Sequence, residues 1–304
     1  MIAIKTENLS KIYNDKIALD NLNLEIKQGE VYGFIGRNGA GKTTTINLML
    51  SLIHPTNGKI YINEKLVEFK NQDYKKVIGY VPDVPAYPKY MNAVEYLIYT
   101  CDMYEVVNSK EKALELLAFV DLKDLTKKIG AYSRGMKQRL AIAAALVHDP
   151  EIIIMDEPTS ALDPIGRKDV MNIIKKLKGN KTIFYSTHIL EDVEKVCDRI
   201  GLLENGKLLL EDTIENIQEN YFNSKMFIET DKEVKDIYTL LKKLGVKNNI
   251  EMNHKGIICD VKGETTAQDI LEVLLENKIK IIEFRRLNAT LEDVFIKVTS
   301  EETT

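Results

Sequence analysis

The chain has few cysteines, and their positions exclude a disulfide framework. Its three cysteines, Cys101, Cys197 and Cys259, are far apart and none belongs to a CxxC pair. An odd number of isolated cysteines also argues against a structural zinc site. We therefore expect free thiols in a reducing cytosol.

A long apolar stretch is missing as well. The longest run, LAIAAALV at 140–147, has eight residues, whereas about 20 are needed to cross the hydrocarbon core of a bilayer. The amino terminus, MIAIKTENLSKIY, has acidic and polar residues where a signal peptide would have its apolar core. The chain is thus expected not to cross a membrane, and to act at one only through a partner.

Neither sign of charge dominates. The sequence has 42 Lys and Arg against 46 Asp and Glu, a net charge of -4. A nucleic-acid-binding domain usually carries an excess of basic residues, so this balance indicates a mixed, solvated surface and no nucleic-acid partner. With 304 residues, the chain can form one large domain, or one of about 200 residues and a smaller one.

Strand-like and helix-like segments alternate through the first two thirds of the chain. Apolar residues at helical spacing predict a helix over 42–52, which ends before the turn residues HPTNG at 54–58. Short apolar runs with turns or helices between them suit a parallel sheet buried on both faces. The expected strands are 2–9, 17–26, 31–36, 58–62, 76–82, 151–157, 181–187 and 199–205.

Helical patterns dominate from about 84 to 147, which predicts a helical subdomain inserted into the strand-rich core; the expected helices are 91–104, 111–120 and 135–147. After Glu211 the pattern restarts in the order βαββαβ, which suggests a small ferredoxin-like unit. We therefore predict an α/β fold with a first domain over 1–215 and an α+β accessory domain over 216–304. The expected elements of the second domain are 224–230, 232–245, 248–254, 255–261, 266–277 and 278–287, with a closing helix over 291–299.

Residues 36–44, GRNGAGKTT, fit the phosphate-binding pattern GxxxxGK[ST] and lie between an expected strand and an expected helix. The glycines let backbone N–H groups turn toward phosphate oxygens, and the helix start adds its unpaired donors and positive end. Lys42 would reach the β- and γ-phosphates, and the Thr43 hydroxyl would bind Mg²⁺. The alternative is an unrelated glycine-rich turn, which this context disfavours.

The segment EIIIMDEP at 151–158 ends a buried strand with two carboxylates. Such an arrangement is unfavourable unless a cation or substrate lies there. Asp156 would hold Mg²⁺, and Glu157 would orient or deprotonate a water that attacks the γ-phosphoryl group. The alternative is an acidic strand end that caps the next turn, and the nearby phosphate loop argues against it.

A second polar helix start lies in GAYSRGMKQRL at 130–140. Ser133 is placed as an N-cap, and Gly135 lets the backbone approach an anion closely. Because the chain's own phosphate loop already surrounds one side of a triphosphate, this start would serve the nucleotide of a second, head-to-tail copy. From this segment alone, an ordinary capped helix is the better interpretation.

The segments GRNGAGKTT, YSRGMKQRL, IIIMDEPTSALDP and STH resemble, in this order, the motifs of ATP-binding-cassette (ABC) transporter ATPase subunits. They extend over about 150 residues, and the resemblance covers about 1–210. It implies a P-loop NTPase cassette with a RecA-like core, an antiparallel β part and an inserted helical subdomain. It also implies ATP and Mg²⁺ as cofactors and ATP hydrolysis as the activity.

The resemblance implies a role for each matching residue. Tyr13 would stack on adenine, Asp156 would bind Mg²⁺, Glu157 would be the catalytic carboxylate and His188 would sense the γ-phosphate. The remaining matches are the phosphate loop (Gly36, Arg37, Asn38, Gly39, Ala40, Gly41, Lys42, Thr43, Thr44), the signature that contacts the opposite subunit's nucleotide (Ser133, Arg134, Gly135, Met136) and the dimer-interface loop (Ser160, Ala161, Leu162, Asp163).

Two segments depart from the family pattern. The usual signature Leu-Ser-Gly-Gly-Gln is Tyr-Ser-Arg-Gly-Met over 132–136. The usual glutamine that joins the core to the helical subdomain is replaced by Asp83, which can accept hydrogen bonds or bind Mg²⁺ but cannot donate as an amide can. Together with the tail LEDVFIKVT, these changes resemble the drug- and peptide-export branch, often tied to antibiotic resistance.

The expected protein is the ATPase subunit of an ABC exporter, peripheral at the cytoplasmic face of the cell membrane. It would act as a homodimer, or paired with a similar ATPase subunit, beneath integral-membrane permease subunits, and it would close on ATP and reopen after hydrolysis. The alternatives are a soluble ABC ATPase of DNA repair or translation and a non-hydrolysing regulatory cassette. A single cassette argues against the first, and Glu157 and His188 argue against the second.

Overall fold

The computed structural model describes residues 1–68, 70, 73–217, 225–243, 250–252, 254–260, 266–286 and 291–301. Contacts divide the chain into two compact units, Met1–Asp212 and Thr213–Thr304. Parts of the expected second-domain elements, at 224, 244–249, 253, 261 and 287, lie outside the described residues. The domain boundary at 215/216 and the subdomain limits 84–147 stay predictions. In the described part of the chain, no helix has the length and apolar character needed to cross a membrane.

The larger sheet of the first unit has the strand order β10-β9-β3-β8-β7-β6, and its strands pair in parallel from β9 through β6. Every residue of β3, β7 and β8 is buried, as expected for strands covered on both faces. The parallel α/β core predicted from the sequence is therefore confirmed. The strand bounds are β3 Val31–Ile35, β6 Ile78–Val81, β7 Ile152–Asp156, β8 Thr182–Thr187, β9 Arg199–Glu204 and β10 Lys207–Thr213.

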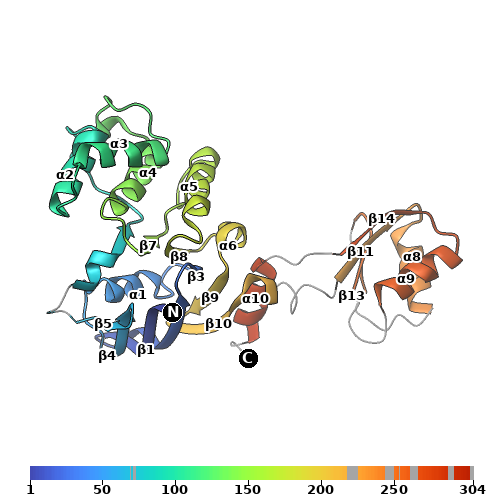
Figure 1. Cartoon of the computed structure of the whole chain (residues 1–304). Helices are drawn as coiled ribbons and strands as arrows, with labels where there is room; N and C mark the ends of the chain where they lie inside the picture. Colours follow the sequence, from blue (N-terminus) through green and yellow to red (C-terminus); the bar gives the residue numbers. More distant parts are fainter. Residues whose placement is uncertain are drawn as a thin grey trace. The chain divides into compact units, whose positions relative to one another are not determined.

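An antiparallel sheet of order β2-β1-β4-β5 packs against this core (Figure 1). Leu24 of β2, Phe34 of β3 and Ile154 of β7 belong to one buried hydrophobic cluster, together with Ile46 of helix α1. The two sheets of the first unit therefore share a core. The bounds are β1 Ile2–Tyr13, β2 Lys16–Lys27, α1 Lys42–Met49, β4 Asn57–Ile62 and β5 Lys65–Leu66.

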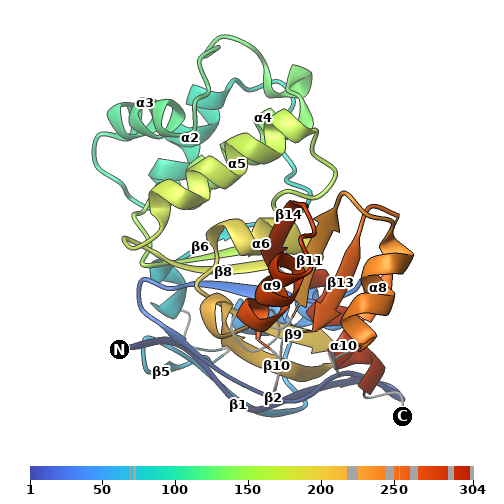
Figure 2. The same cartoon turned by 90° about the vertical axis from the view of Figure 1, so that its right-hand side faces the viewer.

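Three helices, α2 (Ala93–Met103), α3 (Ser109–Phe119) and α4 (Arg134–Ala145), lie in the chain between β6 and β7. Figures 1 and 2 show them gathered at the end of the first unit that is far from the antiparallel sheet. The strand expected over 76–82 begins only at Ile78, because Asp73–Val77 form a 3₁₀ turn. Helices α5 (Pro164–Leu177) and α6 (Leu190–Val196) follow β7 and β8.

The second unit has the βαββαβ order predicted from the sequence, and its strands pair antiparallel in the order β12-β13-β11-β14. This is the arrangement of a ferredoxin-like unit. Ile237 of α8 and Ile270 of α9 share a buried cluster with Ile228 of β11, so both helices pack on the sheet. The bounds are β11 Lys225–Thr230, α8 Val234–Lys243, β12 Ile250–Met252, β13 Ile257–Asp260, α9 Ala267–Glu276, β14 Ile281–Arg286 and α10 Leu291–Glu301.

Candidate nucleotide-binding site

The loop after β3 folds tightly around the start of α1. Gly41 has a φ of +117°, and a Cβ there would lie 2.6 Å from the carbonyl oxygen of Ala18, so this position requires glycine. At Gly36 a Cβ would lie 2.4 Å from the carbonyl oxygen of Leu203. The Lys42 side chain is only 6% exposed, and its Nζ donates to the Gly36 carbonyl at 2.7 Å. The loop therefore holds the lysine ammonium group inside its own curve.

Asp156 lies at the carboxyl end of β7, opposite Ser186 of the parallel strand β8. One carboxylate oxygen accepts a hydrogen bond from the Thr43 hydroxyl at 3.1 Å, and the other accepts from the Ser186 hydroxyl at 2.7 Å. The buried carboxylate thus ties the first turn of α1 to the end of β8.

Glu157 lies between two nitrogen groups. Its Oε1 is 3.2 Å from Lys42 Nζ, and its Oε2 is 2.8 Å from His188 Nδ1. The Glu157 backbone is in the left-handed region (φ 48°), and its N–H donates to the Ser186 carbonyl at 3.0 Å. Non-glycine residues with such φ values are strained and cluster at functional sites. The backbone turn directs the carboxylate toward the phosphate loop.

These residues fit a nucleotide polyphosphate with Mg²⁺. The first turn of α1 contains no acidic residue, and its leading N–H groups have no helical partner, so anions are favoured there. Thr43 and Asp156 offer oxygen ligands, and Mg²⁺ usually takes one or two carboxylates together with phosphate oxygens and waters. The described residues contain no cluster of three or more His, Cys, Asp or Glu arranged for a metal ion, and the Mg²⁺ role of Thr43 and Asp156 stays a prediction.

Tyr13, the predicted adenine-stacking residue, ends β1. Its side chain is exposed, and Lys11 Nζ lies 4.9 Å from the ring centroid. An accessible ring is what stacking on a base requires, and the adenine role stays a prediction.

Ser133 is the N-cap of α4, and its hydroxyl accepts a hydrogen bond from the Met136 N–H at 3.2 Å. Ser133 and Arg134 are exposed, whereas Tyr132 is buried. Gly135 lies close to α5: a Cβ added to Gly135 would lie 3.5 Å from the Cα of Gly166. The starts of α4 and α5 therefore lie near each other, with room for about one methyl group between Gly135 and Gly166.

The predicted dimer-interface loop, Ser160–Asp163, leads directly into α5. Asp163 is the N-cap of that helix and accepts from the Gly166 N–H at 3.2 Å, while Ala161 is exposed with a φ of 50°. This loop and the signature turn are thus anchored to each other where the two helices begin.

Asp83, predicted as a tentative Mg²⁺ ligand, pairs with Arg134 in this structure: its Oδ1 is 3.1 Å from Arg134 Nη2. Its role toward Mg²⁺ stays a prediction. Burial raises the pKa of Asp83, Arg134 opposes the shift, and the nearby carboxylates of Glu157 and Asp156 add to it. Asp83 also helps to raise the pKa of Tyr80 to about 12, after burial and Asp156. Asp83 therefore lies in a negative field that Arg134 partly offsets.

A buried carboxylate that the sequence reasoning missed lies behind the interface loop. Asp192 of α6 is 1% exposed and accepts hydrogen bonds from Thr159 Oγ1 and Arg167 Nε, both at 2.7 Å, and from Tyr185 OH at 3.3 Å. Ser186 was missed as well. Ser186 lies two residues before His188, and Asp192 lies four residues after it. Their position beside the STH motif is the sequence signal that could have indicated them.

Two families match the chain: residues 19–160 match the family described as "ABC transporter", and residues 213–299 match the family "ATP-binding protein DrrA1-3-like, C-terminal domain". The chain is 37% identical to the bacitracin transport ATP-binding protein BcrA of Bacillus licheniformis, over 97% of this chain and 96% of the relative. It is 29% identical to the linearmycin resistance ATP-binding protein LnrL of Bacillus subtilis (strain 168), over 97% and 98%.

Among solved structures, the chain resembles the dimeric post-hydrolysis state of the ATP-binding cassette MJ0796 bound to ADP and Pi. The TM-score is 0.62 at 29% sequence identity, covering 69% of this chain and 98% of that chain. A nucleotide-free ATP-binding cassette from an ABC transporter gives a TM-score of 0.64 at 28% identity, covering 72% and 96%.

Replacing Asp192 with Asn is expected to lower the free energy of unfolding by about 2–4 kcal/mol, because the ion pair with Arg167 loses its buried negative charge and one acceptor oxygen becomes an NH₂ group that faces donors. Urea unfolding followed by circular dichroism measures the change. The control is Glu191→Gln, which removes the exposed ion pairs of Glu191 with Arg167 at 3.2 Å and with Lys195 at 3.9 Å and should change stability by less than about 0.5 kcal/mol. Equal losses in the two variants would show that Asp192 does not anchor this region.

Proposed function

The chain belongs to the ABC transporter family, and from this premise we propose that it is the ATP-hydrolysing subunit of an exporter of drugs, antibiotics or peptides. The resemblance predicted from the sequence, an ABC ATP-binding cassette with an accessory domain, is confirmed by the family matches and the solved cassettes. The observation that carries the proposal is the contact of Glu157 with both Lys42 and His188 at the phosphate loop.

ATP hydrolysis requires a positioned water and a way to spread negative charge. Lys42 would neutralise charge on the β- and γ-phosphates, and Thr43 and Asp156 would hold Mg²⁺, which screens the phosphate oxygens when bound. The Glu157 carboxylate would accept a proton from the attacking water or orient it. Lys42 Nζ lies 3.2 Å from one Glu157 oxygen and His188 Nδ1 lies 2.8 Å from the other, so these two groups restrain the orientation of the base.

We propose that two copies, or one copy and a similar ATPase subunit, close around the nucleotides. Ser133 and Arg134 are exposed at the start of α4, where an N-cap hydroxyl and open N–H groups suit a phosphate. The cassette MJ0796, which this chain resembles, has a dimeric structure. Each protomer would then supply its signature turn to the other protomer's nucleotide.

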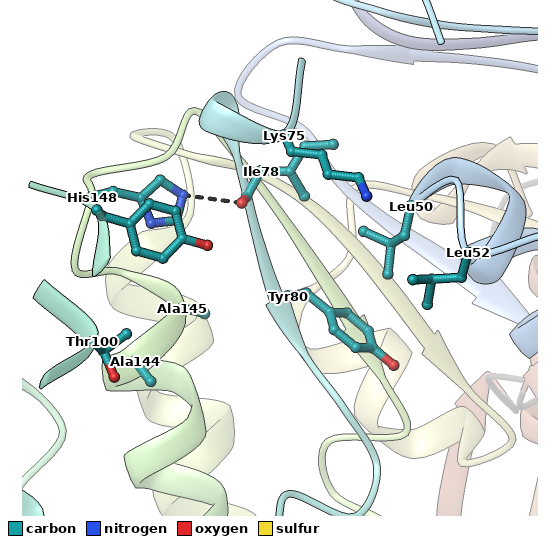
Figure 3. A pocket seen from close by; sticks show the side chains of 10 residues that line it. Leu50, Leu52, Lys75, Ile78, Tyr80, Thr100, Ala144, Ala145 and His148 are labelled. Carbon is teal, nitrogen blue, oxygen red and sulfur yellow. Dashed lines mark hydrogen bonds between the residues drawn. The ribbon is translucent and has the colours of Figure 1, made fainter. Parts of the chain in front are cut away.

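A groove of about 340 Å³ offers a docking surface for the permease (Figure 3). It is lined by Leu50, Leu52, Lys75, Ile78, Tyr80, Thr100, Tyr104, Ala144, Ala145 and His148. In one wall, the His148 ring stacks on Tyr104 with centroids 4.1 Å apart, and its Nε2 lies 3.0 Å from the Ile78 carbonyl oxygen. Leu52 is 59% exposed on the opposite wall.

The groove joins the inserted helices to the strand core, because its residues come from α2 and α4 on one side and from β6 and the end of α1 on the other. An apolar helix at the cytoplasmic face of a permease would bury this surface. Because it would contact both the inserted helices and the strand core, a movement of one relative to the other would displace it. We propose such a helix as the occupant, because the curated relatives include a transport ATP-binding protein. The proposed contact implies a position at the cytoplasmic face of the cell membrane, which is part of the proposal.

Lys42→Ala is expected to lower ATP hydrolysis by roughly 10²-fold or more, since the phosphates lose their buried cation. Phosphate release from the purified chain measures this, and it also separates a hydrolase from a cassette that only binds nucleotide. Lys123→Ala, at a side chain 86% exposed, should hydrolyse ATP at the wild-type rate. Wild-type turnover by Lys42→Ala would remove the phosphate-loop assignment.

Glu157→Gln is expected to slow hydrolysis by roughly 10²–10⁴-fold while ATP binding is retained, because the amide keeps the shape but cannot accept the proton. The variant should accumulate as an ATP-bound dimer in gel filtration. If it hydrolyses ATP normally, Glu157 is not the base; if it stays monomeric with ATP, the proposed role of Ser133 in the other protomer's site is wrong.

Leu52→Glu is expected to release the chain from membranes that contain its permease while phosphate release by the soluble chain stays within about twofold, because a charge in the groove opposes an apolar helix. Co-expression with a candidate integral-membrane permease subunit, followed by membrane sedimentation, tests this. Leu275→Glu is the matched control, since Leu275 of the second unit is also 59% exposed. Release of both variants, or of neither, would argue against the groove.

A further inference from the structure

Asp83 and Arg134, the two charged departures from the family pattern, bind each other. Their side chains are 41% and 43% exposed, and Asp83 Oδ1 lies 3.1 Å from Arg134 Nη2. Asp83 directly precedes the helical insertion, and Arg134 is the first residue of α4. The two residues are 51 positions apart in the sequence. Their contact joins the segment near Asp156 and Glu157 to the signature turn.

The start of α4 is electrostatically unusual. An arginine lies at its first position, no acidic residue lies in its first turn, and the helix dipole makes this end positive. Such an end is stabilised by an anion, and Asp83 supplies one from outside the helix. In the proposed function the same exposed end meets a phosphate of the partner protomer's ATP. A guanidinium binds phosphate at least as well as carboxylate, so the two anions compete for Arg134.

Other contacts hold the Asp83 segment in place without the ion pair. Gln138 Nε2 donates to the Pro82 carbonyl at 3.1 Å, and Tyr87 OH donates to the Lys137 carbonyl at 2.7 Å. Arg134 can therefore leave Asp83 while residues 82–87 stay attached to α4. Glu157 and Asp156 also disfavour an ionised Asp83, so Arg134 is its main compensating charge.

We propose that Asp83 is an intrachain competitor for Arg134: it holds the guanidinium within one protomer until the partner's nucleotide displaces it. Arg134 then contacts the phosphate of the opposite site, and Asp83 opposes dimer closure. This inference rests on the proposed function. It predicts that loss of the Asp83 charge tightens the ATP-bound dimer, whereas loss of a merely structural ion pair would not.

The test measures the dissociation constant of the ATP-bound dimer by sedimentation velocity in the Glu157→Gln background, where hydrolysis is slow. Adding Asp83→Asn should tighten the dimer roughly two- to twentyfold, because one exposed ion pair is released at each of two equivalent sites. Adding Arg134→Gln should weaken it. The combination of Asp83→Asn and Arg134→Gln should match Arg134→Gln alone, since Asp83 acts only through Arg134.

Asp121→Asn is the matched control. It makes the same substitution in the exposed ion pair of Asp121 with Lys123 at 3.2 Å, and it should leave the dissociation constant unchanged. Thermal unfolding checks that each variant is folded, and Asp83→Ser replaces Asp83→Asn if the latter is not. The gain from Asp83→Asn should also shrink at high salt, because exposed ion pairs are screened.

The outcomes separate the two proposals. If Glu157→Gln alone stays monomeric with ATP, the proposed function fails and this inference fails with it. If that dimer forms but Asp83→Asn leaves it unchanged or weaker, only the inference is overturned. A gain from Asp83→Asn that persists when Arg134 is Gln would likewise overturn it, because Asp83 would then act on another group.

Discussion

The alignment of β3, β8 and β7 is the constraint on which the nucleotide site depends. The three strands run parallel, with Ile35 opposite Thr187 and Asp156 opposite Ser186. Their carboxyl ends therefore meet at one edge of the sheet, and the loops that leave them carry Lys42, Glu157 and His188 to within hydrogen-bonding distance. A shift of one residue in the pairing of β7 with β8 would turn the Asp156 side chain to the other face of the sheet. The complete burial of these strands fixes the register, because every position has a packing partner.

Much of this site was predictable because its residues are contiguous in short motifs. The phosphate loop from Gly36 to Thr44 requires glycine where the backbone makes close approaches, and the carboxylates of Asp156 and Glu157 end an apolar run. The alternation of strands and helices likewise predicted both units. In contrast, the partners of a side chain depend on packing between distant segments. Asp192 binds Arg167 and Thr159, which are 25 and 33 positions away, and Asp83 and Arg134 are 51 positions apart; no local pattern in the sequence encodes such pairs.

The signature turn and the interface loop, both proposed to face a partner, precede the neighbouring helices α4 and α5. Gly135 and Gly166 allow the first turns of these helices to lie near each other, since a Cβ on either glycine would lie 3.5–3.6 Å from the Cα of the other. Each helix is capped by its own side chain, Ser133 for α4 and Asp163 for α5, so both starts are well defined. Asp192 accepts hydrogen bonds from Arg167, in the first turn of α5, and from Thr159, in the preceding loop. These bonds hold both segments against α6. The signature turn and the interface loop thus lie at neighbouring helix starts, each with its own cap.

Asp83 and Arg134 are best understood as one change rather than two. A carboxylate at position 83 is partly buried near Asp156 and Glu157, and these groups disfavour its charge. With glycine at position 134, no guanidinium would offset that cost. Conversely, an arginine at the first position of α4 adds positive charge to a helix end that is already positive, and a neutral glutamine at position 83 would compensate it only in part. Each residue thus supplies the counter-charge that makes the other tolerable. The same ion pair connects the surroundings of one protomer's nucleotide site to the turn proposed to serve the partner's site. One contact therefore balances the two charges and, in the proposal, couples the two sites.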